Sequence, residues 1–523
     1  MASTSVTLAL PLAALLLYIF ILEPLLLNPL SRIPGPKSFA LTKWRLALED
    51  WRGTRTRKIL ALHEEYGPVV RIGPNEVSFN SLSALRTIYG PGSQYGRTTF
   101  YRMFDVYGEQ NLFTLHSAKS HGDRKKLLSH AYSKSAIYQE RATTMVEEKV
   151  NNYMKLLKTQ PGGNNDIFAT LHYFSLDSIT SFIYGRHGAT SATQGNATHR
   201  SLIDDIMDAS RRRLFWCLVH LPAPTKWLYA QAGILEHLVK PILPMQKPST
   251  YTGIRNFALK AFKDFRSDKD DEKHGSDDAN DYSILGLLWK HHESQKEGGL
   301  SDLQMASECA DHFLAGIDTT SDTLMFLIWA LSLPANQRFQ NKLREDILSV
   351  SGESLNRHGY PTANAADKSE YLAAVIKETL RLYAPLPSTE FRSMGAESIV
   401  DNYTIPADTV VGMSPYILHR NPDVFEDPMH FDPERWLRPG AQDLERWFWG
   451  FSSGGRMCIG KHLAMAEMTT LVASIYSKYS TTIAPGFEDT TPAITARVEV
   501  FYDERFPIIQ ENKCYIKFQK VEE

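Results

Sequence analysis

The sequence predicts a mainly α-helical domain with a small accessory β-sheet region, preceded by an N-terminal transmembrane helix. Two observations predict the domain: helical spacing of apolar residues dominates the middle of the chain, and short β-branched runs gather early and late. The lack of charged residues between positions 1 and 22 predicts the membrane helix. With 523 residues, 43% of them hydrophobic, the chain can bury a large core.

The N-terminal segment is almost wholly apolar from Val6 to Leu22, and Glu23 and Pro24 then interrupt it before three leucines continue the run. About twenty apolar residues span a bilayer. Basic residues follow, so we expect a single-pass anchor over residues 1–30 with the body facing the cytosol. A segment that lies on the membrane without crossing it is the alternative. Residues 31–46 then form a proline-rich elbow and linker, and residues 47–523 form the main domain.

The elements of the main domain are predicted in chain order from periodicity, turn pairs and caps. We expect a small sheet at 66–79, helices over 117–184, a long helix from the capping box Ser301/Gln304 to Pro334, more helices to 383, strands within 390–415, a helix over 462–477, and strands at 498–502 and 514–518. Residues 201–262 form either a membrane-touching lid or a core-facing helix pair, and the charged residues 266–280 form a solvated, mobile loop.

Composition narrows the classes of function. The net charge of −2 gives no reason to expect a nucleic-acid partner. Four cysteines in so long a chain do not form a disulfide framework, which fits a reducing, cytosol-facing domain. Three of them, Cys217, Cys309 and Cys514, have no ligand-like spacing and are expected to be ordinary buried residues.

The fourth cysteine lies in a glycine-rich loop, Phe451-Ser-Ser-Gly454-Gly-Arg456-Met-Cys458-Ile-Gly460, that a helix follows. The glycines allow tight turns and close approach to a flat cofactor. Backbone N–H groups and the helix start favour the ionised sulfur. Arg456 can reach an anionic group at the cofactor's edge, and Phe451 supplies an apolar wall. A thiolate ligand on haem iron favours O–O cleavage, so this loop indicates oxygen activation.

This loop resembles the haem-binding loop of the cytochrome P-450 family, with Cys458 at the axial-ligand position. The resemblance extends over essentially everything after the anchor and implies the cytochrome P-450 fold, a large helical haem domain. The implied cofactor is haem b with an axial cysteine thiolate, which Phe451, Gly454, Arg456 and Gly460 help to hold. The motifs are similar to those of filamentous-fungal members that modify secondary metabolites. This similarity implies a monooxygenase that acts on a hydrophobic small molecule.

The long helix contains an unusual stretch, Ala315-Gly-Ile-Asp318-Thr319-Thr. Glycine, aspartate and threonine are poor choices for a helix interior, and a hydroxyl there can bond back to a carbonyl one turn earlier. A local opening beside iron could hold oxygen and water. In the resemblance, Asp318 and Thr319 stand at the positions that deliver protons to oxygen. Close packing of the helix on a neighbour is the structural alternative.

Other motifs of the same family follow in order. Glu378-Thr-Leu-Arg381 and the later Phe-Asp-Pro-Glu-Arg435-Trp imply a buried network of Glu378, Arg381 and Arg435 behind the haem, with a structural role. Arg392 matches a position that binds a haem propionate. His121 and Lys125 stand where many members carry tryptophan and arginine, so the exact propionate partner stays open, with Arg124 a substitute.

The substrate pocket and the partners are the least determined. Expected pocket residues are Tyr101, Phe104, Phe313, Leu314, Ala315, Leu386 and Thr389. No nucleotide-binding fingerprint is present, so NADPH is expected to act only indirectly. The resemblance implies electrons from the NADPH–cytochrome reductase of the endoplasmic reticulum membrane, with cytochrome b5 as a second candidate donor. Desaturation, ring coupling or isomerisation at the same haem, or a haem sensor without turnover, are the alternatives.

Overall fold

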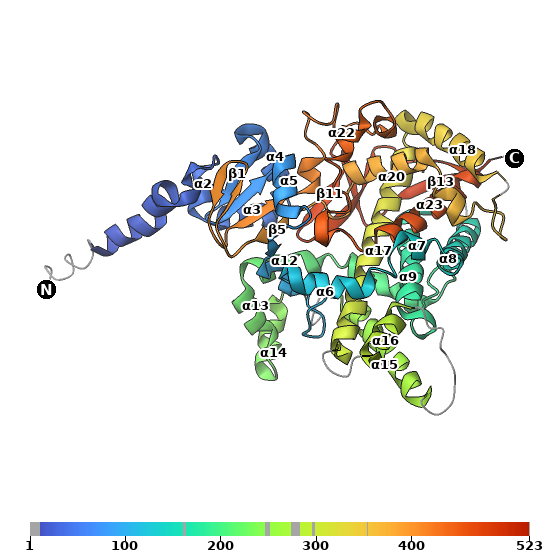
Figure 1. Ribbon diagram of the computed structural model, residues 1–523, viewed down its shortest axis with the longest axis horizontal. Coiled ribbons are helices and arrows are strands. Elements are labelled where there is room, and N and C mark those ends of the chain that lie inside the picture. Colours follow the sequence, from blue (N-terminus) through green and yellow to red (C-terminus); the bar gives the residue numbers. More distant parts are fainter. Residues whose placement is uncertain are drawn as a thin grey trace.

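The computed structural model describes residues 11–159, 164–245, 251–272, 283–294, 299–352 and 354–521. Helices form most of the body, and a five-stranded sheet lies at the end from which the N-terminal helix projects (Figure 1). The longer helices are α3 (Trp44–Arg52), α4 (Arg55–Tyr66), α5 (Leu82–Tyr89), α6 (Ala118–Leu128), α8 (Glu140–Thr159), α9 (Ile167–Tyr184), α12 (Ser210–His220), α13 (Pro222–Tyr229), α15 (Thr252–Glu272), α16 (Ile284–Ser294), α17 (Asp302–Ser332), α18 (Gln337–Ser351), α20 (Glu370–Leu382) and α23 (Lys461–Lys478). Shorter ones are α2 (Lys37–Leu41), α7 (Lys134–Ile137), α10 (Ala197–Arg200), α11 (Asp204–Met207), α14 (Ile234–Val239), α19 (Ala363–Ala366), α21 (Pro415–Leu418) and α22 (Ala441–Glu445).

The strands form small sheets from distant parts of the chain. The five-stranded sheet has the order β1 (Val69–Gly73), β2 (Glu76–Phe79), β8 (Val410–Met413), β5 (Glu390–Ser393) and β3 (Gly96–Arg97). Two three-stranded sheets join β11 (Glu499–Tyr502), β10 (Thr490–Ala496) and β12 (Ile508–Glu511), and β4 (Asn164–Asp166), β13 (Tyr515–Lys520) and β9 (Tyr479–Ile483). A hairpin pairs β6 (Ser398–Val400) with β7 (Tyr403–Ile405). The mainly helical fold with small sheets is as predicted.

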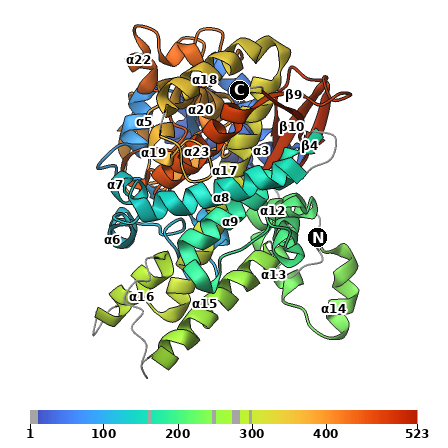
Figure 2. The ribbon, with the colours of Figure 1, turned by 90° about the vertical axis from the view of Figure 1, so that its right-hand side faces the viewer.

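Helix α17 crosses the middle of the body and packs chiefly against α9 (Figures 1 and 2). The predicted capping box is present: the Ser301 hydroxyl accepts the backbone N–H of Gln304, and the Gln304 side chain accepts the backbone N–H of Ser301. Pro334 follows the end of the helix, as the sequence indicated. Because most of α17 is buried, it forms the spine on which the site is built.

The predicted transmembrane helix is not supported. Among the described residues, no helix is both long and apolar enough to cross a bilayer. The apolar segment does not form one continuous α-helix. After residues 11–17, the backbone continues as a ten-residue π-helix, Tyr18–Leu27, which contains Pro24, the proline that interrupts the apolar run in the sequence. The carbonyl of Pro24 accepts a hydrogen bond from Arg71 of β1 at 2.7 Å, so this end of the segment is fastened to the body. Residues 1–10 lie outside the described part.

The region from 201 to 262 contains both a core-facing helix and helices with exposed apolar side chains, and the membrane-touching lid stays a prediction. Helix α15 is core-facing and packs on α17, whereas α13 and α14 stand away from the body (Figure 2). Trp227, Ile234 and Leu238 on these two helices are largely exposed, as a membrane-touching lid requires. The predicted loop at 266–280 begins later than expected, because α15 continues to Glu272; the remainder of that segment lies outside the described residues.

Candidate haem-binding site

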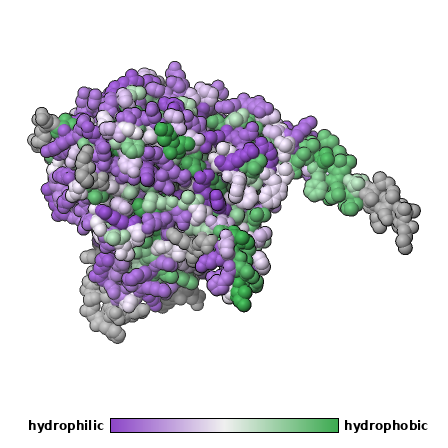
Figure 3. Space-filling model, turned by 180° about the vertical axis from the view of Figure 1, so that it is seen from behind, coloured by the Kyte–Doolittle hydropathy of each residue, from purple (hydrophilic) through white to green (hydrophobic). Residues whose placement is uncertain are grey.

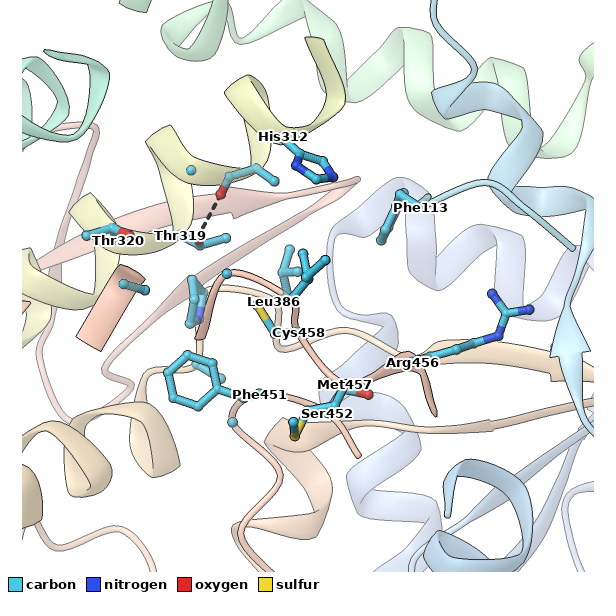
Figure 4. A pocket seen from close by; sticks show the side chains of 18 of the residues that line it. Phe113, His312, Thr319, Thr320, Leu386, Phe451, Ser452, Arg456, Met457 and Cys458 are labelled. Atoms are coloured by element: carbon cyan, nitrogen blue, oxygen red, sulfur yellow. Dashed lines mark hydrogen bonds between the residues drawn. The ribbon is translucent and has the colours of Figure 1, made fainter. Parts of the chain in front are cut away.

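A cavity of about 270 Å³ lies between α17 and the loop that carries Cys458 (Figure 4). Its lining comes from β3 and the segment after it, α6, α17, the segment before β5, the Cys458 loop and α23. These parts are distant in the sequence, so the fold itself assembles the site. Most of the exposed area of the lining is apolar, with polar side chains contributed by several of these segments.

The Cys458 loop is held by backbone and side-chain hydrogen bonds. The backbone N–H of Cys458 donates to the Phe451 carbonyl at 2.9 Å. The Lys125 ammonium donates to the carbonyls of Gly455 and Met457 at 2.9 and 2.8 Å. Both the Cys458 thiol and the Phe451 ring line the cavity, and this cysteine forms no disulfide. The loop therefore presents one sulfur atom to the cavity.

Opposing influences act on the Cys458 thiol. Burial is the largest and raises its pKa, whereas the backbone N–H groups of Gly460 and Lys461 and the charge of Lys125 lower it. The backbone dipoles act in the predicted direction, but desolvation of the thiol outweighs them. A bound metal cation ionises a coordinating thiol outright, so the site would need its iron to hold a thiolate.

The nitrogen-bearing side chains that line the cavity include Arg97, His121 and Arg456. Burial lowers the pKa of Arg456 to about 9, and the charges of Arg97 and Arg392 add to the effect. Burial and Arg392 likewise lower the pKa of Arg97 to about 10. The Nε atom of Arg97 is buried with no hydrogen-bond partner. Such a cluster of desolvated like charges favours an anionic ligand.

The other predicted propionate partners are placed differently. Arg392 does not line the cavity; it donates to Glu390 at 2.9 Å and to the Tyr101 hydroxyl at 3.2 Å. Lys125 holds the Cys458 loop, as described above. Burial lowers the pKa of His121 to about 3, so its imidazole is neutral and can donate one N–H. Gly460 lines the cavity and Gly454 lies behind it.

This set of residues fits the predicted haem. A lone sulfur on a glycine-rich loop matches an axial ligand, the apolar walls match a flat macrocycle, and the cationic side chains of Arg97 and Arg456 match its two carboxylates. Cys458, Arg456, Arg97 and His121 are therefore the residues that would hold the group.

Thr319 lies on the cavity face of α17, and its hydroxyl donates to the Ala315 carbonyl at 2.8 Å, the dashed line in Figure 4. This is the predicted bond to the preceding turn, but α17 stays helical through it and shows no local opening. Packing explains the glycine: a Cβ on Gly316 would lie 2.7 Å from the Cδ1 of Ile179 on α9. The structural alternative therefore holds for Gly316.

Asp318 does not line the cavity. Burial raises its pKa to about 6, and the charge of Arg211 on α12 lowers it. Burial and the neighbouring Asp318 together raise the pKa of Asp322. One Asp318 oxygen is buried without a hydrogen-bond partner. Asp318 is thus a buried acid on α17, one residue before the hydroxyl that faces the cavity.

The predicted ion network is present and fully buried. Arg381 donates two hydrogen bonds to the Glu378 carboxylate, at 2.8 and 2.9 Å, and Arg435 donates a third at 3.1 Å. The indole of Trp436 and the backbone N–H of Asp432 also donate to Glu378, at 3.0 and 2.9 Å. One carboxylate therefore joins α20 to the segment at 432–436.

This network extends to the Cys458 loop through His419. Arg381 donates to the His419 carbonyl at 2.9 Å, and the His419 Nδ1 lies 3.2 Å from the Arg381 carbonyl. The His419 Nε2 accepts the backbone N–H of Trp449 at 2.8 Å, two residues before Phe451. Burial, with Arg381 and Arg420, lowers the pKa of His419 to about 3, which suits a neutral ring with one donor and one acceptor.

The predicted pocket residues are only partly in the cavity. Tyr101, Ala315 and Leu386 line it. Phe104 lies behind the lining residue Phe113, with their ring centroids 5.4 Å apart. Three others point elsewhere: Phe313 is buried against Tyr184 and Phe257, and neither Leu314 nor Thr389 contributes to the lining.

Among the lining residues that sequence reasoning missed, Arg97 and Glu467 have clear chemistry. Arg97 lies in no motif, and only the sheet pairing of β3 with β5 brings it to the rim. Glu467 follows Cys458 by nine residues on α23; burial raises its pKa to about 7, and it accepts a hydrogen bond from Ser178 at 2.5 Å. A lone acid in an otherwise apolar helix turn was the available signal for Glu467.

We expect Gly454→Ala to destabilise the loop strongly. Gly454 has φ +63°, and a Cβ there would lie 2.6 Å from the Gly90 carbonyl carbon and closer still to the Tyr89 oxygen. Strain and backbone displacement should cost about 1–3 kcal/mol. Haem content and the midpoint of thermal unfolding measure the loss. Gly455→Ala is the matched control, because nothing lies within 4 Å of its Cβ; equal behaviour of the two variants would contradict the geometry.

Comparison with known proteins agrees with this geometry. The sequence model of the family described as cytochrome P-450 matches residues 34–498. Among curated relatives, the cytochrome P-450 monooxygenase poxM of Penicillium oxalicum is 26% identical over 494 residues, covering 92% of this chain and 90% of the relative. The cytochrome P-450 monooxygenase aflV of Aspergillus parasiticus is 27% identical over 488 residues, with 92% and 90% covered. With Cys458 at the cavity and the family's sequence pattern over most of its length, this chain belongs to the cytochrome P-450 monooxygenase family.

Proposed function

We propose that this enzyme uses haem b to insert one oxygen atom from O2 into a hydrophobic small molecule of fungal secondary metabolism. The observation that carries the proposal is the pairing of the Cys458 thiol with the Thr319 hydroxyl on the walls of one largely apolar cavity. The fungal monooxygenases that resemble this chain along most of its length support the biological setting.

A bound haem with a cysteine thiolate would supply the activation of oxygen. The residues of this chain would do the rest. Cys458 would be the axial ligand, and Arg97, Arg456 and His121 would bind the propionates. The Thr319 hydroxyl, turned away from the Ala315 carbonyl to which it now donates, would donate a hydrogen bond toward the reacting oxygen, and Asp318 would relay protons to it. The apolar walls would exclude bulk water.

We further propose that the enzyme works at the surface of the endoplasmic reticulum and receives electrons from the NADPH–cytochrome reductase there, with cytochrome b5 as a second donor. Exposed apolar side chains support membrane contact. They occur on two parts of the surface: the N-terminal helical segment, with Leu12, Phe20 and Leu26, and α13–α14, with Trp227 and Ile234. Figure 3 shows the N-terminal helical segment in green.

The proposal is tested on the purified full chain. Reduction and carbon monoxide should give the red-shifted absorption that marks a thiolate ligand. With added reductase, some apolar compounds of a fungal-metabolite panel should accelerate NADPH oxidation and gain one oxygen atom by mass spectrometry. Haem binding without any ligand-dependent NADPH oxidation would favour a sensor, and products that lose two hydrogens would indicate desaturation instead.

We expect Thr319→Val to separate electron consumption from product formation. Losing the hydroxyl removes a proton-delivering group at the cavity, which should lower product formation about 100-fold. NADPH oxidation should fall much less, with the difference appearing as hydrogen peroxide. Thr319→Ser keeps the hydroxyl and is the matched control. Unchanged coupling in the valine variant would remove Thr319 from the proposed mechanism.

A further inference from the structure

The cavity face of α17 carries two ionisable side chains that the proposed mechanism does not use. This face consists of two rows with helical spacing: Asp311, Ala315, Thr319 and Thr323, and beside them His312, Gly316 and Thr320. Asp311 lies two turns before Thr319, about 12 Å along the helix axis. The polar pair is therefore in the cavity but well separated from the oxygen-facing hydroxyl.

His312 is already committed to other protein groups. Its Nδ1 lies 2.7 Å from the hydroxyl of Tyr132, and its Nε2 lies 3.2 Å from a carboxylate oxygen of Glu308. The same carboxylate accepts Arg124 at 2.5 Å and the backbone N–H of Leu112 at 3.1 Å. Burial opposes the charge on His312, but Glu308 outweighs it and raises the pKa of the imidazole. Arg124, Glu308 and His312 therefore form a charge-paired cluster that supports the helix.

Asp311 is different, because its carboxyl is half-buried and faces the cavity. The backbone N–H of Phe113 helps to stabilise its charge, as does Arg97 at the rim. Among the described residues, no other side chain donates a hydrogen bond to it. Burial raises its pKa to about 7. In Figure 4, His312 and Phe113 mark this part of the cavity, above Leu386 and Cys458.

We infer that Asp311 anchors the substrate by accepting a hydrogen bond from a hydroxyl group that lies far from the carbon to be oxidised. Burying a polar group in an apolar cavity is unfavourable unless a partner arrives, and a bound hydroxyl supplies that partner. The inference rests on the proposed function, since it assumes haem at the floor of the same cavity.

The local charge selects a neutral donor over a cation. Arg97 and His312 already act electrostatically on Asp311, and Arg124 and His312 lie against Glu308. Each acid therefore has basic groups beside it, so a further ammonium would find little net attraction there. A hydroxyl brings no charge and can donate to the carboxylate. We therefore assign this subsite to alcohols or phenols.

A series of imidazoles tests the subsite on the full-length holoenzyme. 1-Alkylimidazoles bind haem iron through nitrogen and shift its absorption, so dissociation constants follow without turnover. Each 1-(ω-hydroxyalkyl)imidazole is compared with the alkylimidazole of equal chain length, over about six to twelve carbons, a range that brackets the ~12 Å between Thr319 and Asp311. The variants are Asp311→Asn and Asp311→Leu, with the alkyl compounds as the control for pocket integrity in each variant.

At the best chain length, the hydroxyl should tighten binding to the native protein about tenfold. The gain should shrink in Asp311→Asn and vanish in Asp311→Leu, while the alkyl compounds bind all three proteins alike. A hydroxyl gain that is absent at every length, or that persists in Asp311→Leu, overturns the inference. An Asp311-dependent gain that is larger for ω-aminoalkyl compounds overturns the assignment to hydroxyls. If no imidazole shifts the spectrum, the proposed function fails as well.

Discussion

Replacing Cys458 with alanine is expected to abolish the red-shifted absorption of the reduced, carbon monoxide-treated protein and to bring substrate turnover to background. The sulfur would be the iron ligand on the floor of the cavity, and electron donation from a thiolate would favour O–O cleavage. Alanine keeps the loop backbone, including the bond from residue 458 to the Phe451 carbonyl. The loss is therefore chemical, and absorption spectroscopy with reductase-supported turnover measures it.

Cys217→Ala is the matched control for this experiment. Cys217 is half-buried on α12 and does not line the cavity, so its replacement should leave both the spectrum and turnover intact. Cys458→His should still bind haem but without the thiolate signature, which separates ligation from folding. Retention of the red shift in Cys458→Ala would exclude this cysteine as the ligand.

The features that the sequence predicted well are those in which neighbouring residues determine the structure. The capping box at Ser301 and Gln304 is a contact within four residues, and the pairing of Glu378 with Arg381 lies within one helix turn. The glycine-rich loop around Cys458, which the structure places at the cavity, is likewise a local motif. In each case, interactions within one short segment determine the local structure.

The features that sequence reasoning missed depend on contacts between distant segments. Arg97 reaches the rim because β3 pairs with β5, almost three hundred residues later. Phe313 and Ala315 are close in sequence, but α17 turns one toward the core and the other toward the cavity. The hydrogen bond from Arg71 to the Pro24 carbonyl could not be predicted from the sequence either. Composition alone made the first thirty residues resemble a membrane-spanning segment.

We expect Glu378→Gln to lower the free energy of unfolding as strongly as the most damaging single substitutions in this protein. In Glu378→Gln the side chain keeps its shape, but Arg381 and Arg435 lose their shared negative partner while buried. Breaking a buried ion pair by removing one partner typically costs about 3–5 kcal/mol. The effect should reach the haem, because Arg381 also holds His419, and His419 holds the backbone of Trp449 before the Cys458 loop.

Haem retention during heating, followed by the carbon monoxide spectrum, measures this loss, and Glu445→Gln gives the matched control. Glu445 pairs with Lys377, which lies on α20 as Glu378 does. That pair is solvent-exposed and should contribute less than about 1 kcal/mol. A second variant, Arg381→Lys, keeps the charge but not the planar fork that reaches both Glu378 oxygens and the carbonyl of His419. It should also lose haem faster than the native protein. If both network variants retained haem as well as Glu445→Gln does, the network would not be what positions the loop.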